Sequence, residues 1–488
     1  MLGPTRCGKG ATLEIVNLLL GLHGMSVISI DPTAQNASVC GKARVDAGSK
    51  VLALNPKGLH VGRYPDLASC GCNPMVAGID IDSPNFYEEA VAIADAFDWS
   101  DKGDRFFPDA GRDYTTSLIM HVRRRDGDNA NLSTVLQLMM DHEEIDENGK
   151  PTKGPRYTAA EMVASGHFQI AALAGRFLTQ GSPKTIDSIR QTAQTAARSL
   201  LSDPIRADLS KNGIDWGQLT ETPTTVFVIL PAEDLQFHAV WLKLIVSCAL
   251  NAIYRKAGNV RVNTLLMLSE FFAVGALRSV QAAMGQGAKY GVRVWPVLQD
   301  IGQLQTMFGD HGAETFIANS GCVFAFTPGD GNTSEFLSRY AGEHAVEHVS
   351  VSDDPQGGPP RISVDVRDER IWPPHKIRNI PKFHGLVWKF GNSVPQPVYC
   401  PPYWEIAACR KLARQDPYQP ASSSGERRPS GMLRKFVGVI GVATLLAGGV
   451  ALVPRPVVFH FLRAAGLMAA PAAKPPAYAA PPHRGRRF

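Results

Sequence analysis

The stretch MLGPTRCGKG, residues 1–10, decides the fold. It fits the first seven positions of G-x-x-x-x-G-K-[ST], from Gly3 to Lys9, and has Gly10 where the pattern ends in Ser or Thr. Glycines let backbone N–H groups turn inward around phosphate oxygens, and the lysine brings a positive charge to the β- and γ-phosphates. We therefore expect the whole loop to contact a nucleotide. Its residues are Gly3, Pro4, Thr5, Arg6, Cys7, Gly8, Lys9 and Gly10.

The segments that follow the loop have the order of a nucleotide-binding α/β sheet. Apolar residues at helical spacing predict a helix from about Lys9 to Gly21, whose positive end points at the bound anion. Two short apolar runs, residues 26–31 and 49–56, predict buried strands. Asp31 ends the first of these strands, where ligands collect in open α/β sheets, so a role near the nucleotide or Mg²⁺ is one hypothesis for it.

The pattern changes between about residues 85 and 209, where amphipathic helical segments follow one another with hardly a strand. Apolar strand segments then return at residues 224–231, 262–271, 292–300 and 322–328, alternating with helices. This order predicts an α/β fold with a mainly parallel sheet, interrupted by an inserted all-α domain. The predicted boundaries are 1–85 and 216–400 for the two parts of the nucleotide-binding domain, 86–215 for the insertion, 401–435 for a linker and 436–488 for a tail.

Two later strands end in residues suited to nucleotide hydrolysis. Ser269 and Glu270 follow the apolar run LLML, where such sheets usually place Asp-Glu. In that pair the Asp orders the Mg²⁺ shell and the Glu polarises the attacking water. Glu270 keeps the second role, whereas Ser269 could bond only neutrally to a metal-bound water. Gln299 ends the strand VWPVLQ, and its amide is a candidate for orienting the water; a loop-facing glutamine explains the position equally well.

Charge is distributed unevenly along the chain. The formal net charge is +5, but residues 427–488 hold ten Lys and Arg and no acid, so the preceding part carries −5. A broad nucleic-acid-binding face on that part is therefore not indicated. The eight cysteines are scattered and predict reduced thiols, and zinc binding by Cys70 and Cys72 lacks two further ligands. Residues 436–453 form the one long apolar run, read either as a membrane helix or as part of a loosely specified tail.

Several long motifs together resemble the TraG/TraD-type coupling proteins, the conjugative-transfer ATPases of type IV secretion systems. They include GPTRCGKG, VLALNPKGL, CGCNPMVAGIDIDSPNF and LLMLSEFFAVGALRSVQAAMGQGAKYGVRVWPVLQDIGQL, in the family's order, from about Gly3 to Val394. The resemblance implies a RecA-like P-loop NTPase that binds ATP and Mg²⁺ and assembles as a hexamer at the cytoplasmic face of the bacterial inner membrane. It implies recruitment of a DNA–relaxase complex or a protein substrate to the secretion channel. It also places Glu270 and Gln299 in the catalytic site.

The sequence departs from the family in ways that bear on activity. The N-terminal membrane anchor and most of the strand before the loop are absent, so we expect an N-terminally truncated relative. Ser269 replaces an aspartate, and Ala288 stands where the family tends to place an arginine finger. Gly10 is tolerated in this family. The leading hypothesis is a coupling-protein ATPase, whose hydrolysis the changes at Ser269 and Ala288 would impair. The alternatives are a nucleotide-binding scaffold that does not hydrolyse ATP and a degraded reading frame.

Overall fold

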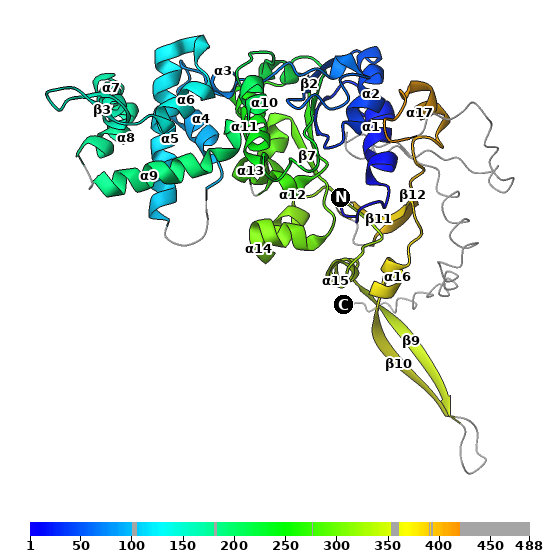
Figure 1. Cartoon of the computed structure of the whole chain (residues 1–488). Helices are drawn as coiled ribbons and strands as arrows, with labels where there is room; N and C mark the ends of the chain where they lie inside the picture. The colour runs from blue at the N-terminus through cyan, green and yellow to red at the C-terminus, as the bar shows by residue number, and fades with distance from the viewer. Residues whose placement is uncertain are drawn as a thin grey trace, which may run out of the picture.

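A five-stranded parallel sheet forms the centre of the molecule (Figure 1). A computed structural model describes residues 1–99, 105–179, 183–275, 277–352, 361–389, 391 and 394–419. The strand order is β2-β5-β1-β6-β7, and every pairing is parallel. The strands are β1 (Ser26–Ile30), β2 (Lys50–Leu54), β5 (Thr224–Val228), β6 (Thr264–Leu268) and β7 (Val292–Pro296). The predicted α/β class with a parallel sheet is confirmed.

The central strands are apolar throughout because both faces of the sheet are covered. In β6, Leu265 and Met267 pack into the core on one face, whereas Leu266 and Leu268 pack into the core on the other. Val27 and Ile28 of β1 divide in the same way. Successive side chains of a strand point to opposite faces, so an uninterrupted apolar run is what two cores require.

The residues before the phosphate loop form a short parallel bridge between two sheets. Leu2 pairs with Leu298, just beyond β7, and with Ala325 of β8 (Cys322–Phe326). Its N–H donates to Phe324 O at 2.8 Å, and its carbonyl accepts from Phe326 N at 2.9 Å. Strand β8 then pairs antiparallel with β11 (His384–Lys389), which pairs with β12 (Gln396–Tyr399). One buried residue thus occupies the strand position that leads into the loop.

Four helical segments cover one face of the sheet. They are η1 (Gly10–Glu14), a π-helical turn, followed by α1 (Ile15–Leu20), α2 (Gln35–Asp46) and α17 (Ala407–Leu412). The helix predicted from about Lys9 to Gly21 is confirmed. Helix α2 was missed, because its sequence QNASVCGKARVD shows no apolar stripe. It is nevertheless buried on most sides, through small residues and through Arg44, whose guanidinium donates to Leu22 O and Met25 O.

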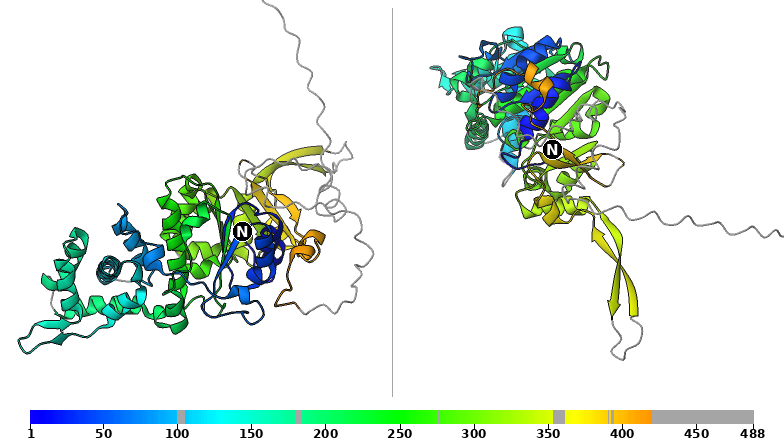
Figure 2. Two further views of the ribbon diagram at one scale, coloured as in Figure 1. Left: turned by 90° about the horizontal axis from the view of Figure 1, so that it is seen from above. Right: turned by 90° about the vertical axis from the view of Figure 1, so that its right-hand side faces the viewer.

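The chain between β2 and β5 is helical and extends away from the sheet (Figures 1 and 2). Its helices are α3 (Pro74–Ala77), α4 (Phe86–Asp95), α5 (Phe106–Asp126), α6 (Leu132–Met140), α7 (Pro155–Ala164), α8 (Phe168–Thr179), α9 (Pro183–Ala196) and α10 (Asp203–Asp208). A short hairpin, β3 (Glu144–Ile145) with β4 (Pro151–Lys153), interrupts this otherwise helical part. Helix α11 (Ala239–Arg255) packs against the second face of the sheet and contacts α3 and α4.

The last third of the described chain adds helices and a projecting ribbon. The helices are α12 (Phe271–Val274), α13 (Arg278–Gln286), α14 (Ile301–Ala318), α15 (Gly331–Tyr340) and α16 (Pro374–Arg378). Strands β9 (Glu343–Ser352) and β10 (Arg361–Arg370) pair over ten positions and form an antiparallel ribbon. The ribbon extends away from the body in Figures 1 and 2. No other strand of the described chain pairs with it.

Residues 401–419 differ from the sequence expectation of a linker, because they pack against the loop side of the sheet. Tyr403 N donates to Ala11 O at 2.9 Å, and the Tyr403 hydroxyl donates to Asp416 at 2.8 Å. The Arg414 guanidinium donates to backbone carbonyls of α2. In the part of the chain that the structure describes, no helix is long and apolar enough to cross a bilayer. The candidate span 436–453 and the rest of the tail lie outside the described residues.

Candidate functional site

Two residues of the phosphate loop have left-handed backbone conformations: Arg6, with a φ of 65°, and Gly8, with a φ of 108°. The conformation of Gly8 is one that glycine adopts readily, whereas that of Arg6 is uncommon for a residue with a side chain. A Cβ on Gly8 would lie 2.9 Å from the Phe383 ring, and one on Gly3 would lie 2.8 Å from Cys7 Sγ. A side-chain carbon at either glycine would therefore clash with a neighbouring side chain. Such a glycine loop forms a cradle in which backbone N–H groups can approach phosphate oxygens.

Lys9 and the start of the following helix provide positive charge at this cradle. The Lys9 ammonium donates to Gly3 O and so reaches across the loop. The Thr12 hydroxyl and the Thr12 N–H both donate to Gly8 O at 2.9 Å, which fixes the transition from loop to helix. The N–H groups of the first helical turn have no partners within the helix and favour an anion. The predicted binding residues, Gly3 to Gly10, thus form one continuous loop, and their contact with a nucleotide stays a prediction.

The ends of β6 and β7 bring the predicted catalytic residues together. The Glu270 carboxylate and the Gln299 side chain share a hydrogen bond, and Lys9 lies close enough to act on Glu270 electrostatically. Burial raises the pKa of Glu270 above the usual range, while Lys9 and Gln299 oppose the shift. The Gln299 N–H donates to Gln303 Oε1 at 2.8 Å, which holds this strand end in place. A carboxylate beside an amide can bind and orient a water molecule.

Ser269 does not stand alone at the end of β6. Its hydroxyl donates to Glu14 Oε2 at 2.6 Å, and Asn36 Nδ2 donates to the same oxygen at 3.0 Å. Neither Glu14 nor Asn36 was expected at the site from the sequence pattern. A signal for Glu14 existed, since it is the one charged residue in the apolar run ATLEIVNLLLG. Asn36 lies in the helix that the sequence pattern did not reveal.

Asp31 lies at the same edge, where its carboxylate accepts hydrogen bonds from the N-terminal part of α2. Its carboxylate accepts from Ala37 N at 2.8 Å and also from the N–H groups of Gln35 and Asn36. Burial dominates, however, and raises the pKa of Asp31 to about 7, with the nearby Glu14 adding to the shift. The hydrogen bonds to α2 account for the position of Asp31. A direct contact with nucleotide or metal stays a prediction.

An aromatic group borders the loop on the side of residues 383–404. Phe383 has a φ of 62°, which is rare for an aromatic residue, and its ring touches the Cβ position of Gly8. The Lys382 ammonium lies 4.9 Å from the centroid of this ring. Trp404 meets it edge-on with centroids 6.5 Å apart. These rings lie beside the loop and were not anticipated from the sequence.

Ala288 lies outside this constellation. It belongs to η6 (Gly287–Tyr290), which precedes β7 and is therefore at the opposite end of that strand from Gln299. Its carbonyl accepts from Arg293 Nη1 at 3.1 Å. The Ala288 side chain is a methyl group without charge or hydrogen-bond donors, so it cannot act as an arginine finger.

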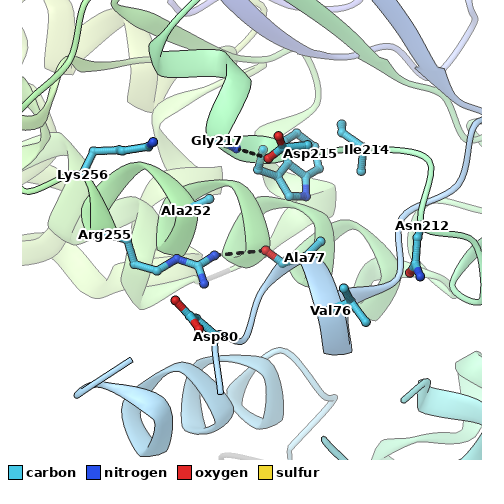
Figure 3. Close-up of a pocket in the computed structure, with 11 residues that line it drawn as sticks. Val76, Ala77, Asp80, Asn212, Ile214, Asp215, Gly217, Ala252, Arg255 and Lys256 are labelled. Carbon is cyan, nitrogen blue, oxygen red and sulfur yellow. Dashed lines mark hydrogen bonds between the residues drawn. The ribbon is translucent and has the colours of Figure 1, made fainter. Parts of the chain in front are cut away.

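A separate cavity of about 530 Å³ lies between the helical segment and α11 (Figure 3). Its charged lining groups already have partners: Arg255 donates to Ala77 O at 3.1 Å, and Lys256 forms an ion pair with Glu221 at 2.8 Å. No residue of the phosphate loop lines it. Among the described residues, no group of three or more His, Cys, Asp or Glu is placed to hold a metal ion, which gives zinc binding at Cys70 and Cys72 no support.

The groups at the loop match the chemistry of a nucleotide with Mg²⁺. The glycine cradle and Lys9 suit phosphate oxygens. Mg²⁺ is commonly bound through one or two carboxylates, several waters and the substrate's phosphates, without a cage made only of protein atoms. Glu14, Glu270 and the Ser269 hydroxyl supply oxygen atoms of this kind beside the cradle. The donor set therefore fits such a complex.

Comparison with known sequences points to one family. The family model described as type IV secretory system conjugative DNA transfer matches residues 1–393. The conjugal transfer protein TraG of Rhizobium radiobacter is 24% identical over 377 residues, which cover 75% of this chain and 56% of that protein. VirD4 of Agrobacterium fabrum is 22% identical over 368 residues, covering 72% and 50%. The chain thus spans about half the length of the curated relatives it matches.

Solved structures show the same fold. The conjugative coupling protein TrwBdeltaN70, in its unbound monoclinic form, aligns with a TM-score of 0.61 and 17% identity over 86% of this chain and 85% of that chain. TrwB in complex with ADP and Mg²⁺ aligns with a TM-score of 0.59 and 17% identity, covering 82% and 84%. The expected RecA-like P-loop architecture agrees with this likeness.

Proposed function

The chain belongs to the type IV secretory system conjugative DNA transfer family, and on that premise we propose that it is an ATP-driven coupling protein. It brings a DNA–relaxase complex or a protein substrate to a type IV secretion channel and powers the transfer. One observation carries this proposal: the phosphate loop with Lys9 meets the Glu270–Gln299 pair at one edge of the sheet. TrwB, which shares the fold, has been solved with an ATP analogue and with ADP and Mg²⁺, which supports these ligands for this chain.

The residues of the chain have distinct tasks in this proposal. Loop N–H groups and Lys9 bind the phosphates and offset their charge. Bound Mg²⁺ supplies Lewis-acid stabilisation of the charge on the transferred phosphoryl group. The Glu270 carboxylate accepts a hydrogen bond from water and holds it for attack, and Gln299 orients both. Burial raises the pKa of Glu270, so its carboxylate becomes protonated at a higher pH than an ordinary glutamate does. As the pH is lowered, turnover should therefore begin to decline at a higher pH.

Nucleotide binding is the first test. In a fluorescence titration with a labelled ATP, Lys9→Ala should weaken binding roughly 10–100-fold, the effect of losing a charge-assisted contact. Lys42→Ala is the matched control, since Lys42 is exposed and pairs with Asp46 on the surface of α2. Equal affinity of the Lys9→Ala variant and the unaltered chain would contradict the proposal.

Phosphate release then separates the motor from the non-hydrolysing scaffold. Ser269 in place of an acid and Ala288 in place of an arginine favour the scaffold, whereas Glu270 and Gln299 favour the motor. If the chain is a motor, Glu270→Gln should abolish phosphate release and leave ATP binding intact. Binding without release by the unaltered chain would establish the scaffold.

Assembly and location follow from the same premise and need their own measurements. We propose that six copies assemble at the cytoplasmic face of the inner membrane, with the helical segment 86–215 contacting the substrate. Mass photometry with and without ATP would measure the number of copies. Crosslinking at this segment during transfer would identify what it contacts. A monomer at all nucleotide concentrations would contradict the assembly.

A further inference from the structure

Glu14 is a buried carboxylate placed beside the nucleotide site by the helix that follows the loop. Its side chain accepts from the Ser269 hydroxyl at 2.6 Å and from Asn36 Nδ2 at 3.0 Å. The residue is only 4% exposed. A carboxylate removed from water requires polar partners, and this one uses the residue that stands where the family has an aspartate. Besides Glu270, the end of β6 thus has a second carboxylate beside it, which comes from a helix.

The direction of the Ser269 hydrogen bond determines whether Ser269 can donate or accept a further hydrogen bond. In this hydrogen bond the Ser269 hydroxyl is the donor and the Glu14 carboxylate oxygen is the acceptor. Its proton is then committed to Glu14, and its oxygen keeps lone pairs that can only accept. Water bound to a metal ion is a strong donor. Ser269 alone could offer either its proton or its lone pairs, whereas Ser269 fixed by Glu14 presents an acceptor.

The local backbone brings Glu14 to this place. Residues 10–14 form a π-helical turn, in which Ile15 N–H donates to Gly10 O, five residues back. Such wide turns are rare and are frequent at functional sites. The turn begins at Gly10, where the usual hydroxyl for Mg²⁺ is missing, and it ends at Glu14.

Electrostatic influence from Glu14 extends over the site. Its charge contributes to the raised pKa values of Asp31, Glu270 and Cys7. Lys9 is the lysine that acts on both Glu270 and Cys7. The Glu14 and Glu270 carboxylates thus lie near each other beside a loop that itself suits anions, with Lys9 as their cationic neighbour. A divalent cation between phosphates and carboxylates would remove that conflict.

We propose that Glu14 is a positioning residue for the Mg²⁺–nucleotide complex, acting through Ser269 in place of the missing strand-end aspartate. This inference rests on the proposed function, because it concerns the same nucleotide site. It also changes how Ser269 is interpreted. If Glu14 supplies the carboxylate, the serine by itself does not impair Mg²⁺–nucleotide binding. It also predicts that Ser269→Asp by itself is harmful, since two carboxylates would then face each other.

The test compares nucleotide affinity with Mg²⁺ and with EDTA, using fluorescent ADP and the full chain. For the unaltered chain, Mg²⁺ should tighten binding. Glu14→Gln and Ser269→Ala should each reduce that gain about tenfold, as loss of a group that orients a metal's ligands does. Affinity in EDTA should stay the same within about twofold, a split that general damage would not produce. Mn²⁺ binding followed by electron paramagnetic resonance gives a direct metal readout.

Two further variants make the test specific. Glu14→Gln/Ser269→Asp should recover the Mg²⁺ gain that Glu14→Gln loses, because the charge returns to the end of β6. Glu89→Gln is the matched control: Glu89 is also a buried helical carboxylate, but it pairs with Arg255 far from the loop. It should leave both affinities unchanged.

The outcomes separate this inference from the function on which it rests. An unaltered chain that binds no nucleotide overturns both. A chain that binds ADP with a Mg²⁺ gain retained in Glu14→Gln and Ser269→Ala overturns the role of Glu14 alone. Equal losses in Mg²⁺ and in EDTA, or no recovery in the double variant, also overturn it.

Discussion

The carboxyl edge of the central sheet and the β9–β10 ribbon invert the usual placement of polar and apolar groups. The edge, formed by the phosphate loop and the ends of β1, β6 and β7, buries Glu14 and Asp31. The ribbon exposes four valines, each by more than half: Val349, Val351, Val364 and Val366. Buried carboxylates are tolerated where N–H and O–H groups replace water, and the ribbon's valines are exposed because neither strand has another layer to pack against. Neither region would be built this way for stability alone.

The largest effect we expect comes from Asp31→Asn at the edge. The folded-state pKa of Asp31 is about 7 against an ordinary 3.8, so the folded protein holds this proton more tightly than the unfolded chain. Stability from this group is therefore present at pH 4 and is lost as the pH rises through 7. At about 1.4 kcal/mol for each pKa unit, Asp31→Asn should gain about 4 kcal/mol at pH 8.

Urea unfolding of both proteins between pH 4 and pH 8 would measure this gain. The asparagine oxygen can still accept from Ala37 N–H, so the N-terminus of α2 keeps that partner. A difference between the two proteins that does not change with pH would contradict the assigned burial cost. It would also remove the contrast with the ribbon, whose charged groups are exposed.

Leu2→Ala should have the next largest effect. Leu2 is 3% exposed and is the bridge between β7 and β8 ahead of the loop. Truncating a buried leucine typically destabilises by about 2–5 kcal/mol, and we expect about 3 kcal/mol in urea unfolding. A loss below about 1 kcal/mol, the common size of an ordinary substitution, would mean that the segment before the loop adds little to the fold.

Tyr403→Phe should be smaller and tests the packing of residues 401–419 on the edge. The buried Tyr403 hydroxyl donates to Asp416, and a hydrogen bond to a charged group contributes about 1.5–3 kcal/mol. We expect a loss of about 2 kcal/mol. Tyr399→Phe is the matched control, because its hydroxyl donates to Glu405 in an exposed setting. Equal effects of the two substitutions would indicate that this segment is not buried.

Val364→Thr on the ribbon should have the smallest effect. An exposed substitution that keeps β-branching usually changes stability by less than about 0.5 kcal/mol. Thermal and urea unfolding of the isolated chain would check this value. A loss above about 1 kcal/mol would show that the valine face packs in solution, and the contrast with the edge would fail.

Most of the fold could be predicted from short-range patterns. Buried parallel strands are continuous apolar runs, so β1, β5 and β6 were visible in the sequence, as was the helix after the loop. Helix α2 was not visible, because a helix buried on many sides by small and polar residues has no apolar stripe. The partners of the ribbon strands were equally hidden, since their apolar face meets no core.

The residues of the candidate site divide in the same way, into those predictable from local sequence and those brought together by tertiary contacts. The sequence by itself determined the phosphate loop and the placement of Glu270 and Gln299 at strand ends, because a loop motif and the end of an apolar run are local features. Only the tertiary structure decided that Glu14 meets Ser269 and that residues 401–419 pack beside the loop. Such contacts join residues hundreds of positions apart, and no local spacing encodes them. The effect of a serine at position 269 therefore depends on the helix packed against it, which carries Glu14.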